Sequence, residues 1–143
     1  MDEGSGNYFG KELLKKYFYK KMPDELKNSF EKQFDVKEKN IIKKLYQSST
    51  PNKYLAEYAL FLFENEKHPF VKKMITEGMD LFVENHILQY SQELETAPLH
   101  FVGSIAYHAQ KYIEISLAKK GLKGASYVRR PIENVLKQLK NII

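Results

Sequence analysis

The chain has 143 residues, 43% of them hydrophobic and 13% aromatic, which excludes a disordered protein and fits one domain or part of one. Its net charge of +5 comes from basic residues, mostly lysines, spread along the whole chain, which favours solvated helix faces over a surface that binds a nucleic-acid partner. The absence of cysteine excludes disulfides and thiolate sites. The sequence shows no signal peptide and no apolar run near the ~20 residues that span a bilayer, so we expect a cytoplasmic protein with no membrane partner.

Helical periodicity dominates the first ninety residues. Apolar side chains at i, i+1, i+4 and i+5 predict a helix over about 8–21, and Pro23 is typical of the start of a second one. A third helix is predicted over 36–46 and a fourth after the loop signal QSSTPNK. The longest predicted helix runs from about 69 to 90, and its apolar stripe is wide enough to indicate burial on two sides.

The last third of the chain changes character after the polar linker SQELETAP. Two short strands are predicted, Leu99–Val102 and Ala125–Val128, the first of them buried, with a helix over 104–120 between them and Gly121 at its C-terminal cap. This order is the pattern of parallel strands joined by a right-handed crossover helix. Two parallel strands make a poor sheet alone, so we expect further strands in a portion that precedes Met1.

Two glycine-containing turns carry the candidate chemistry. In FVGSIA a strand passes directly into a helix at Gly103 and Ser104, where a phosphate or an adenine base could approach the backbone. The alternative is a tight turn that only packs the helix on the strand. In DEGSG two carboxylates beside flexible backbone could bind sugar hydroxyls or a metal-bound water, and the alternative is a cap of the first helix by Asp2 or Ser5.

The remaining polar and aromatic residues give no further site. The four histidines have no metal-ligand spacing, so no metal site is predicted in this chain. The aromatic residues of the fourth helix follow helical spacing, which favours a core over a base-stacking platform; they are Tyr54, Tyr58, Phe61 and Phe63.

Four stretches, in this order, resemble the C-terminal half of the N-acetylglucosamine kinase-like (BadF/BadG-type) ATPases of the sugar kinase/hsp70/actin superfamily: DEGSGNYFGKELLKKYF, TPNKYLAEYALFL, LHFVGSIAYHAQ and GLKGASYVRRPIENVL. The resemblance implies an α/β, predominantly helical lobe fragment of a ribonuclease H-like (actin-like ATPase) fold. Residues 1–143 would be a single unit, most of the C-terminal lobe, without its leading strands and the N-terminal lobe. Met1 stands where the family has a glycine, which suggests a boundary, and Asn134 stands where a glycine usually follows the acid in the last helix.

The same resemblance implies an ATP-dependent kinase of N-acetylglucosamine or a related amino sugar, using ATP and Mg²⁺. Asp2 matches the acid that binds the sugar hydroxyls, and Glu3, Gly4 and Ser5 would shape the sugar-side wall. Gly103 and Ser104 match the adenosine-side turn. The catalytic base and the first phosphate-binding hairpin belong to the N-terminal lobe, the expected partner, so no catalytic residue is assigned and the chain alone is expected to be inactive. A homodimer is an open possibility.

Two other classes stay open at this point. The same family includes ATPase activators of radical dehydratases, but these hold an iron–sulfur cluster on cysteines, which this chain lacks. A non-enzymatic helical module for protein interaction or nucleic-acid binding would fit the basic charge and the helix content, and its affinity for nucleic acid would fall steeply with salt.

Overall fold

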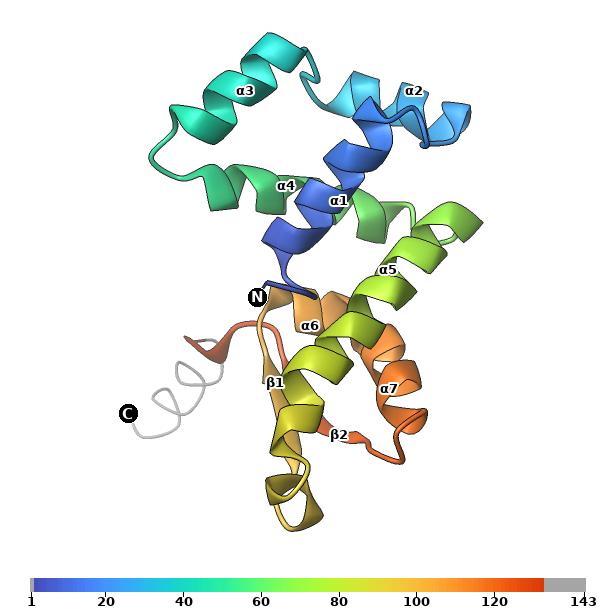
Figure 1. Ribbon diagram of the computed structural model, residues 1–143, viewed down its shortest axis with the longest axis vertical. Coiled ribbons are helices and arrows are strands. Elements are labelled where there is room, and N and C mark those ends of the chain that lie inside the picture. Colours follow the sequence, from blue (N-terminus) through green and yellow to red (C-terminus); the bar gives the residue numbers. More distant parts are fainter. Residues whose placement is uncertain (1, 133–143) are drawn as a thin grey trace, which may run out of the picture. The chain divides into compact units, whose positions relative to one another are not determined.

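The computed structural model describes residues 2–132, which divide into two compact units (Figure 1). The first unit extends to Gly78 and the second begins at Met79. Among the described residues, the strands form one parallel pair, which lies in the second unit, and all other regular elements are helical. The predicted α/β, predominantly helical class is therefore confirmed. Within the described residues, no helix is long and apolar enough to cross a membrane.

The first unit is built from helices, and their start and end signals are local. The Ser5 side chain caps the first helix, which begins at Gly6, two residues before the predicted start, and Lys20, with φ of 54°, follows its end. Pro23 precedes the second helix, whose first turn holds two acidic residues, as the helix dipole favours. The helices are α1 (Gly6–Phe18), α2 (Asp24–Gln33), α3 (Glu38–Tyr46), α4 (Pro51–Glu64) and the greater part of α5 (Pro69–Phe82).

The core of the first unit is aromatic. The Phe30 ring lies 5.4 Å from Tyr58 and 5.2 Å from Phe61, centroid to centroid, and all three side chains are buried. Tyr58 and Phe61 are therefore core residues, as predicted. Helix α1 packs against α4 so closely that a Cβ atom at Gly10 would lie 2.0 Å from the carbonyl oxygen of Leu55. The amino-terminal helix is thus fixed by a backbone-to-backbone approach that only glycine permits.

The second unit contains the predicted strand pair, with helices on the connection between the strands (Figure 1). Strand β1 (Leu99–Val102) pairs in parallel with β2 (Gly124–Val128), with Phe101 opposite Tyr127. Glu114 of the second connecting helix accepts hydrogen bonds from the Gly124 amide at 3.1 Å and from the Tyr127 hydroxyl at 2.5 Å, so it holds β2 to that helix. The connecting helices are α6 (Ser104–His108) and α7 (Gln110–Ala118).

Three sequence-based expectations need correction. The single helix over 104–120 is wrong, because the backbone at Ala109 (φ −92°, ψ 8°) separates α6 from α7. The long helix over 69–90 ends as an α-helix at Phe82 and continues as a π turn, Val83–Ile87, and a 3₁₀ turn. Strand β1 is only partly buried, since Val102 is 61% exposed. A two-stranded sheet has too few layers to cover both faces.

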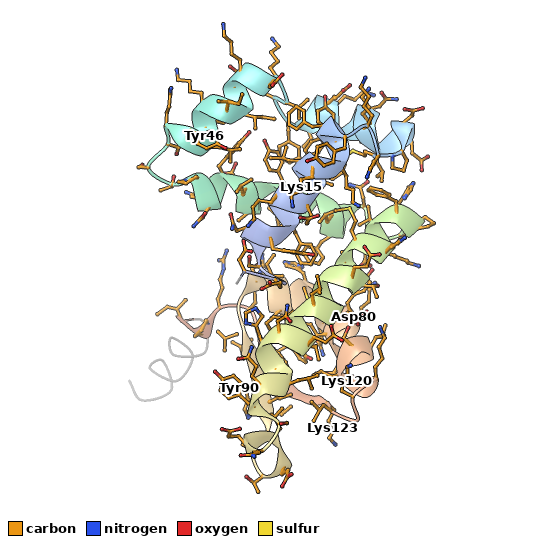
Figure 2. All side chains as sticks on the ribbon, in the orientation of Figure 1. Lys15, Tyr46, Asp80, Tyr90, Lys120 and Lys123 are labelled. Carbon is orange, nitrogen blue, oxygen red and sulfur yellow. The ribbon has the colours of Figure 1, made fainter. Side chains whose placement is uncertain are left out.

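The end of α7 is anchored to α5 by charge. Lys119 Nζ lies 2.8 Å from both carboxylate oxygens of Asp80, and Ser116 Oγ donates to the same carboxylate at 2.6 Å. Lys120 lies 3.5 Å from Glu84, and Figure 2 labels it together with Asp80. The predicted capping glycine, Gly121, follows at φ of 72°. The predicted last helix from Pro131, including Asn134, lies almost wholly outside the described residues.

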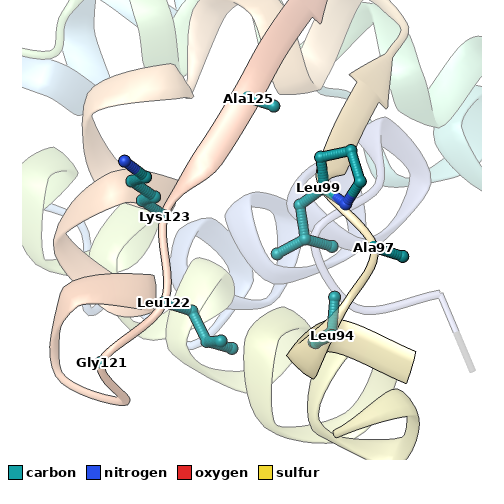
Figure 3. A pocket seen from close by; sticks show the side chains of 8 residues that line it. Leu94, Ala97, Leu99, Gly121, Leu122, Lys123 and Ala125 are labelled. Atoms are coloured by element: carbon teal, nitrogen blue, oxygen red, sulfur yellow. The ribbon is translucent and has the colours of Figure 1, made fainter. Parts of the chain in front are cut away.

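An apolar pocket of about 250 Å³ lies at the amino-terminal ends of the two strands (Figure 3). Leucine side chains dominate its wall, and the chain enters both strands beside it. Its lining residues are Leu94, Ala97, Pro98, Leu99, Gly121, Leu122, Lys123 and Ala125.

Candidate functional site

The first candidate site is the turn that leads into α1. The Ser5 amide donates to the Asp2 carbonyl oxygen at 2.9 Å, which closes a four-residue turn. Gly4 occupies the third position of this turn with φ of 75°, a conformation that L side chains rarely adopt. Asp2, Glu3, Gly4 and Ser5 are thus brought together by the backbone, as their adjacency in the sequence predicts.

Part of this stretch serves the helix itself. Ser5 is the N-cap of α1, and its side-chain oxygen accepts a hydrogen bond from the Tyr8 amide at 3.1 Å. The structural alternative weighed from the sequence is therefore correct for Ser5. Capping uses one acceptor position of the hydroxyl, while Asp2 takes no part in the cap.

The Asp2 carboxylate is held by two side chains that sequence analysis did not single out. Its Oδ2 atom accepts a hydrogen bond from Asn7 Nδ2 and lies 2.7 Å from Lys11 Nζ. Asn7 and Lys11 are four residues apart on α1 and so lie on the same face of the helix. The Lys11 hydrogen bond is the main cause that lowers the pKa of Asp2, burial opposes it, and Asn7 adds to the lowering. Asp2 is therefore ionised at neutral pH.

Asn7 has a second notable feature. Its Oδ1 atom is buried and has no hydrogen-bond partner, the only such side-chain atom among the described residues of the first unit. A buried acceptor without a partner costs about 1–3 kcal/mol. Stability alone therefore does not favour an asparagine in this position. The interaction that Asn7 provides is its hydrogen bond to Asp2.

The second candidate site is the turn at Gly103, between β1 and α6. Gly103 has φ of 126° and ψ of 161°, a region of backbone space that is almost exclusive to glycine. Its amide donates to the Val128 carbonyl at 2.9 Å, and its carbonyl accepts from the Tyr107 amide at 3.1 Å. A Cβ atom at this position would have nothing within 4 Å in the described structure, so the space beside the backbone is open. Ser104 is exposed beside it.

The position of this turn in the strand pair also favours it as a ligand site. Gly103 follows the carboxyl end of β1, whereas the apolar pocket of Figure 3 lies at the opposite ends of the strands. In open α/β sheets ligands bind outside the carboxyl ends of the strands. The two candidate turns belong to different compact units, and each stands on its own geometry.

The resemblance implies two cofactors, ATP and Mg²⁺, and the described residues show a possible place for the first only. The open space at Gly103 fits a nucleotide that lies against the backbone. For Mg²⁺, the described residues contain no group of three or more His, Cys, Asp or Glu side chains that could hold a metal ion. Mg²⁺ in phosphate-transfer enzymes is usually held by one or two carboxylates and by the phosphates of the bound nucleotide, so its site would form together with the nucleotide.

The fold defines the class: this is a mostly helical α/β chain with the architecture of part of a sugar kinase of the actin-like ATPase fold, and the resemblance found in the sequence is confirmed. The chain is similar, with a TM-score of 0.84 and 28% sequence identity, to a protein from Porphyromonas gingivalis whose crystal structure is described as a "Putative N-acetylglucosamine Kinase". The match covers 95% of this chain and 47% of that one, so the chain spans about half the length of its structural neighbour. No protein-family model matches the chain, and no curated protein does.

Proposed function

We propose that this chain is most of the C-terminal half of an ATP-dependent kinase that phosphorylates N-acetylglucosamine or a related amino sugar. The observation that carries the proposal is the structural similarity, over 95% of the chain, to a protein described as a "Putative N-acetylglucosamine Kinase". The order of the sequence motifs supports the same assignment independently, because it rests on side chains rather than on the backbone trace.

In this proposal Asp2 accepts a hydrogen bond from a sugar hydroxyl. Its carboxylate is ionised and one of its oxygens is already fixed by Lys11 and Asn7, which suits a directional bond to a neutral donor. Glu3, Gly4 and Ser5 form the wall beside it. The turn at Gly4 sets the direction of this wall, and the cap at Ser5 fixes it to α1.

The turn at Gly103 and Ser104 contacts the adenosine side of ATP. The absence of a side chain and the open space at Gly103 allow the ligand to reach the backbone. Phosphoryl transfer depends mainly on positioned phosphates, Mg²⁺ and a base. In this proposal the N-terminal lobe of a two-lobed, cytoplasmic protein supplies the base, and this chain contributes binding and orientation.

A coupled ADP-release assay tests the proposal. The complete protein, with ATP, Mg²⁺ and N-acetylglucosamine, is expected to turn over at ~1–100 s⁻¹, as ordinary kinases do. The 143-residue chain alone should show no turnover under the same conditions. ADP release that does not depend on any amino sugar would contradict a sugar kinase, and turnover by the chain alone would contradict its assignment as one half of the enzyme.

A further inference from the structure

We propose that Asn7 and Lys11 are positioning residues for Asp2: together they hold one carboxylate oxygen, Oδ2, and leave the other, Oδ1, to accept a hydrogen bond from a hydroxyl of a neutral sugar. The inference rests on the proposed function and adds two residues to the site. Neither residue is expected to contact the sugar, and both act through the orientation of Asp2.

The contacts of the carboxylate carry this inference. Both donors reach the same oxygen, since Asn7 Nδ2 and Lys11 Nζ lie against Oδ2, the lysine at 2.7 Å. No group among the described residues donates to Oδ1. A carboxylate that accepts from two sides on one oxygen has few remaining rotations, so the direction of its free oxygen is set before any ligand binds.

The two donors project from a fixed backbone, because α1 is held at both ends of this stretch. The Ser5 cap sets the start of the helix, and the approach of Gly10 to the Leu55 carbonyl fixes the next turn against α4. Residues 7 and 11 then project from the same face at successive turns. Asp2 itself is tied to the helix start by the hydrogen bond between its carbonyl and the Ser5 amide.

The geometry of Asn7 argues against a direct ligand contact. Its amide nitrogen must face the carboxylate, because two oxygens in contact would repel. Its Oδ1 atom then points into a buried place without a partner. A ligand cannot reach that atom in this arrangement. Asn7 therefore contributes to the site only through its hydrogen bond to Asp2.

Sugar affinity of the complete protein tests the inference. Asn7→Leu keeps the size of the side chain and removes the donor, and Lys11→Met keeps the apolar stem and removes the charge. Each variant should weaken N-acetylglucosamine binding about tenfold, measured by calorimetry, while ATP binding changes less than about twofold. Lys11→Arg should restore most of the affinity, because it keeps a cationic donor.

Lys15→Met is the matched control. Lys15 lies one turn further along α1 and pairs with Glu12 at 2.6 Å instead of Asp2, so its loss should leave sugar affinity unchanged. Wild-type affinity in both Asn7→Leu and Lys11→Met would overturn the inference. An equal loss of sugar and ATP affinity would also overturn it, because a general structural role would then be sufficient.

A second measurement separates this inference from the proposed function. The Asp2 carboxyl ¹³C signal can be titrated in the 143-residue chain without any ligand. Its midpoint should be below 3.8 in the wild type and higher in Lys11→Met. If the midpoint is the same in both, Lys11 does not hold Asp2, whatever the protein binds. If it shifts but the complete wild-type protein binds no amino sugar, the proposed function fails while the contact stands.

Discussion

Asp80 on α5 accepts a hydrogen bond from Ser116 of α7 at 2.6 Å, although the Ser116 side chain is almost completely buried. Lys119 reaches the same carboxylate from the exposed side. One acidic residue therefore satisfies a buried hydroxyl and an exposed cation, and these two interactions should differ in what they contribute to stability.

Asp80→Ala is expected to lower the free energy of unfolding by about 1–3 kcal/mol, because it leaves the Ser116 hydroxyl buried without a partner. Lys119→Met should cost less than about 1 kcal/mol, since it removes only a solvent-exposed ion pair. Urea denaturation measures both values. Equal losses in the two variants would show that the buried hydroxyl does not matter.

The same residue predicts a pH dependence of stability. Burial raises the pKa of Asp80, but the hydrogen bonds from Lys119 and Ser116 outweigh it and hold the pKa below its usual 3.8. When the folded-state pKa of a carboxyl group is lowered, the group stabilises the folded protein at pH values above its unfolded-state pKa. This stabilisation is lost as the pH falls through the folded-state pKa. Wild type should therefore lose more stability than Asp80→Asn between about pH 5 and pH 2. Parallel curves from denaturation at several pH values would refute this.

Gly10→Ala should destabilise the chain by about 1–3 kcal/mol, because the added Cβ atom would meet the Leu55 carbonyl at 2.0 Å and force α1 from α4. In an ordinary helix interior the same change stabilises by roughly 0.5–1 kcal/mol. The sign of the change in thermal unfolding is therefore the test, and a stabilised variant would mean that the two helices are not in close contact.

How far the sequence could predict this structure depends on the kind of signal. Strand β1 was predicted with its observed bounds, and the parallel pairing follows from the order of elements. The break at Ala109 could not be predicted, because apolar spacing continues through it and no glycine or proline marks it. The capping role of Ser5 was visible as an alternative, since hydroxyl residues before a helix commonly cap it.

The partners of Asp2 could not be predicted for a different reason. Lys11 has the spacing of any surface lysine, and nothing in the sequence shows that its side chain turns back toward the residue nine positions earlier. Asn7 offers a weak signal for a shared role with Lys11. It lies in the first turn of the helix, and the two residues are four positions apart, so they share one face. Side-chain pairing of this kind requires the coordinates.

Substitution at the two candidate turns should separate the two substrates of the complete protein. Gly103→Val places a side chain where the backbone adopts φ of 126° and where the nucleotide is proposed to lie, so the KM for ATP should rise more than the KM for the sugar. Asp2→Asn should raise the KM for the sugar about ten- to hundredfold, through loss of a charge-assisted hydrogen bond of roughly 1.5–3 kcal/mol. It should leave the KM for ATP nearly unchanged.

Circular dichroism and thermal unfolding must first show that both variants fold, because the backbone at Gly103 disfavours any side chain by about 1–3 kcal/mol. If folded Gly103→Val kept the wild-type KM for ATP, the turn would only pack α6 against β1. If Asp2→Asn affected both substrates equally, its carboxylate would serve the structure of the α1 entry rather than the sugar.

Direct detection of the product tests most directly whether this chain is half of an amino-sugar kinase. The complete protein would be incubated with ATP, Mg²⁺ and N-acetylglucosamine, and the sugar analysed by mass spectrometry. We expect a sugar heavier by one phosphoryl group, formed in equal amount with ADP. ADP without any phosphorylated sugar, over a panel of amino sugars, would contradict it and would show an ATPase that does not act on these acceptors.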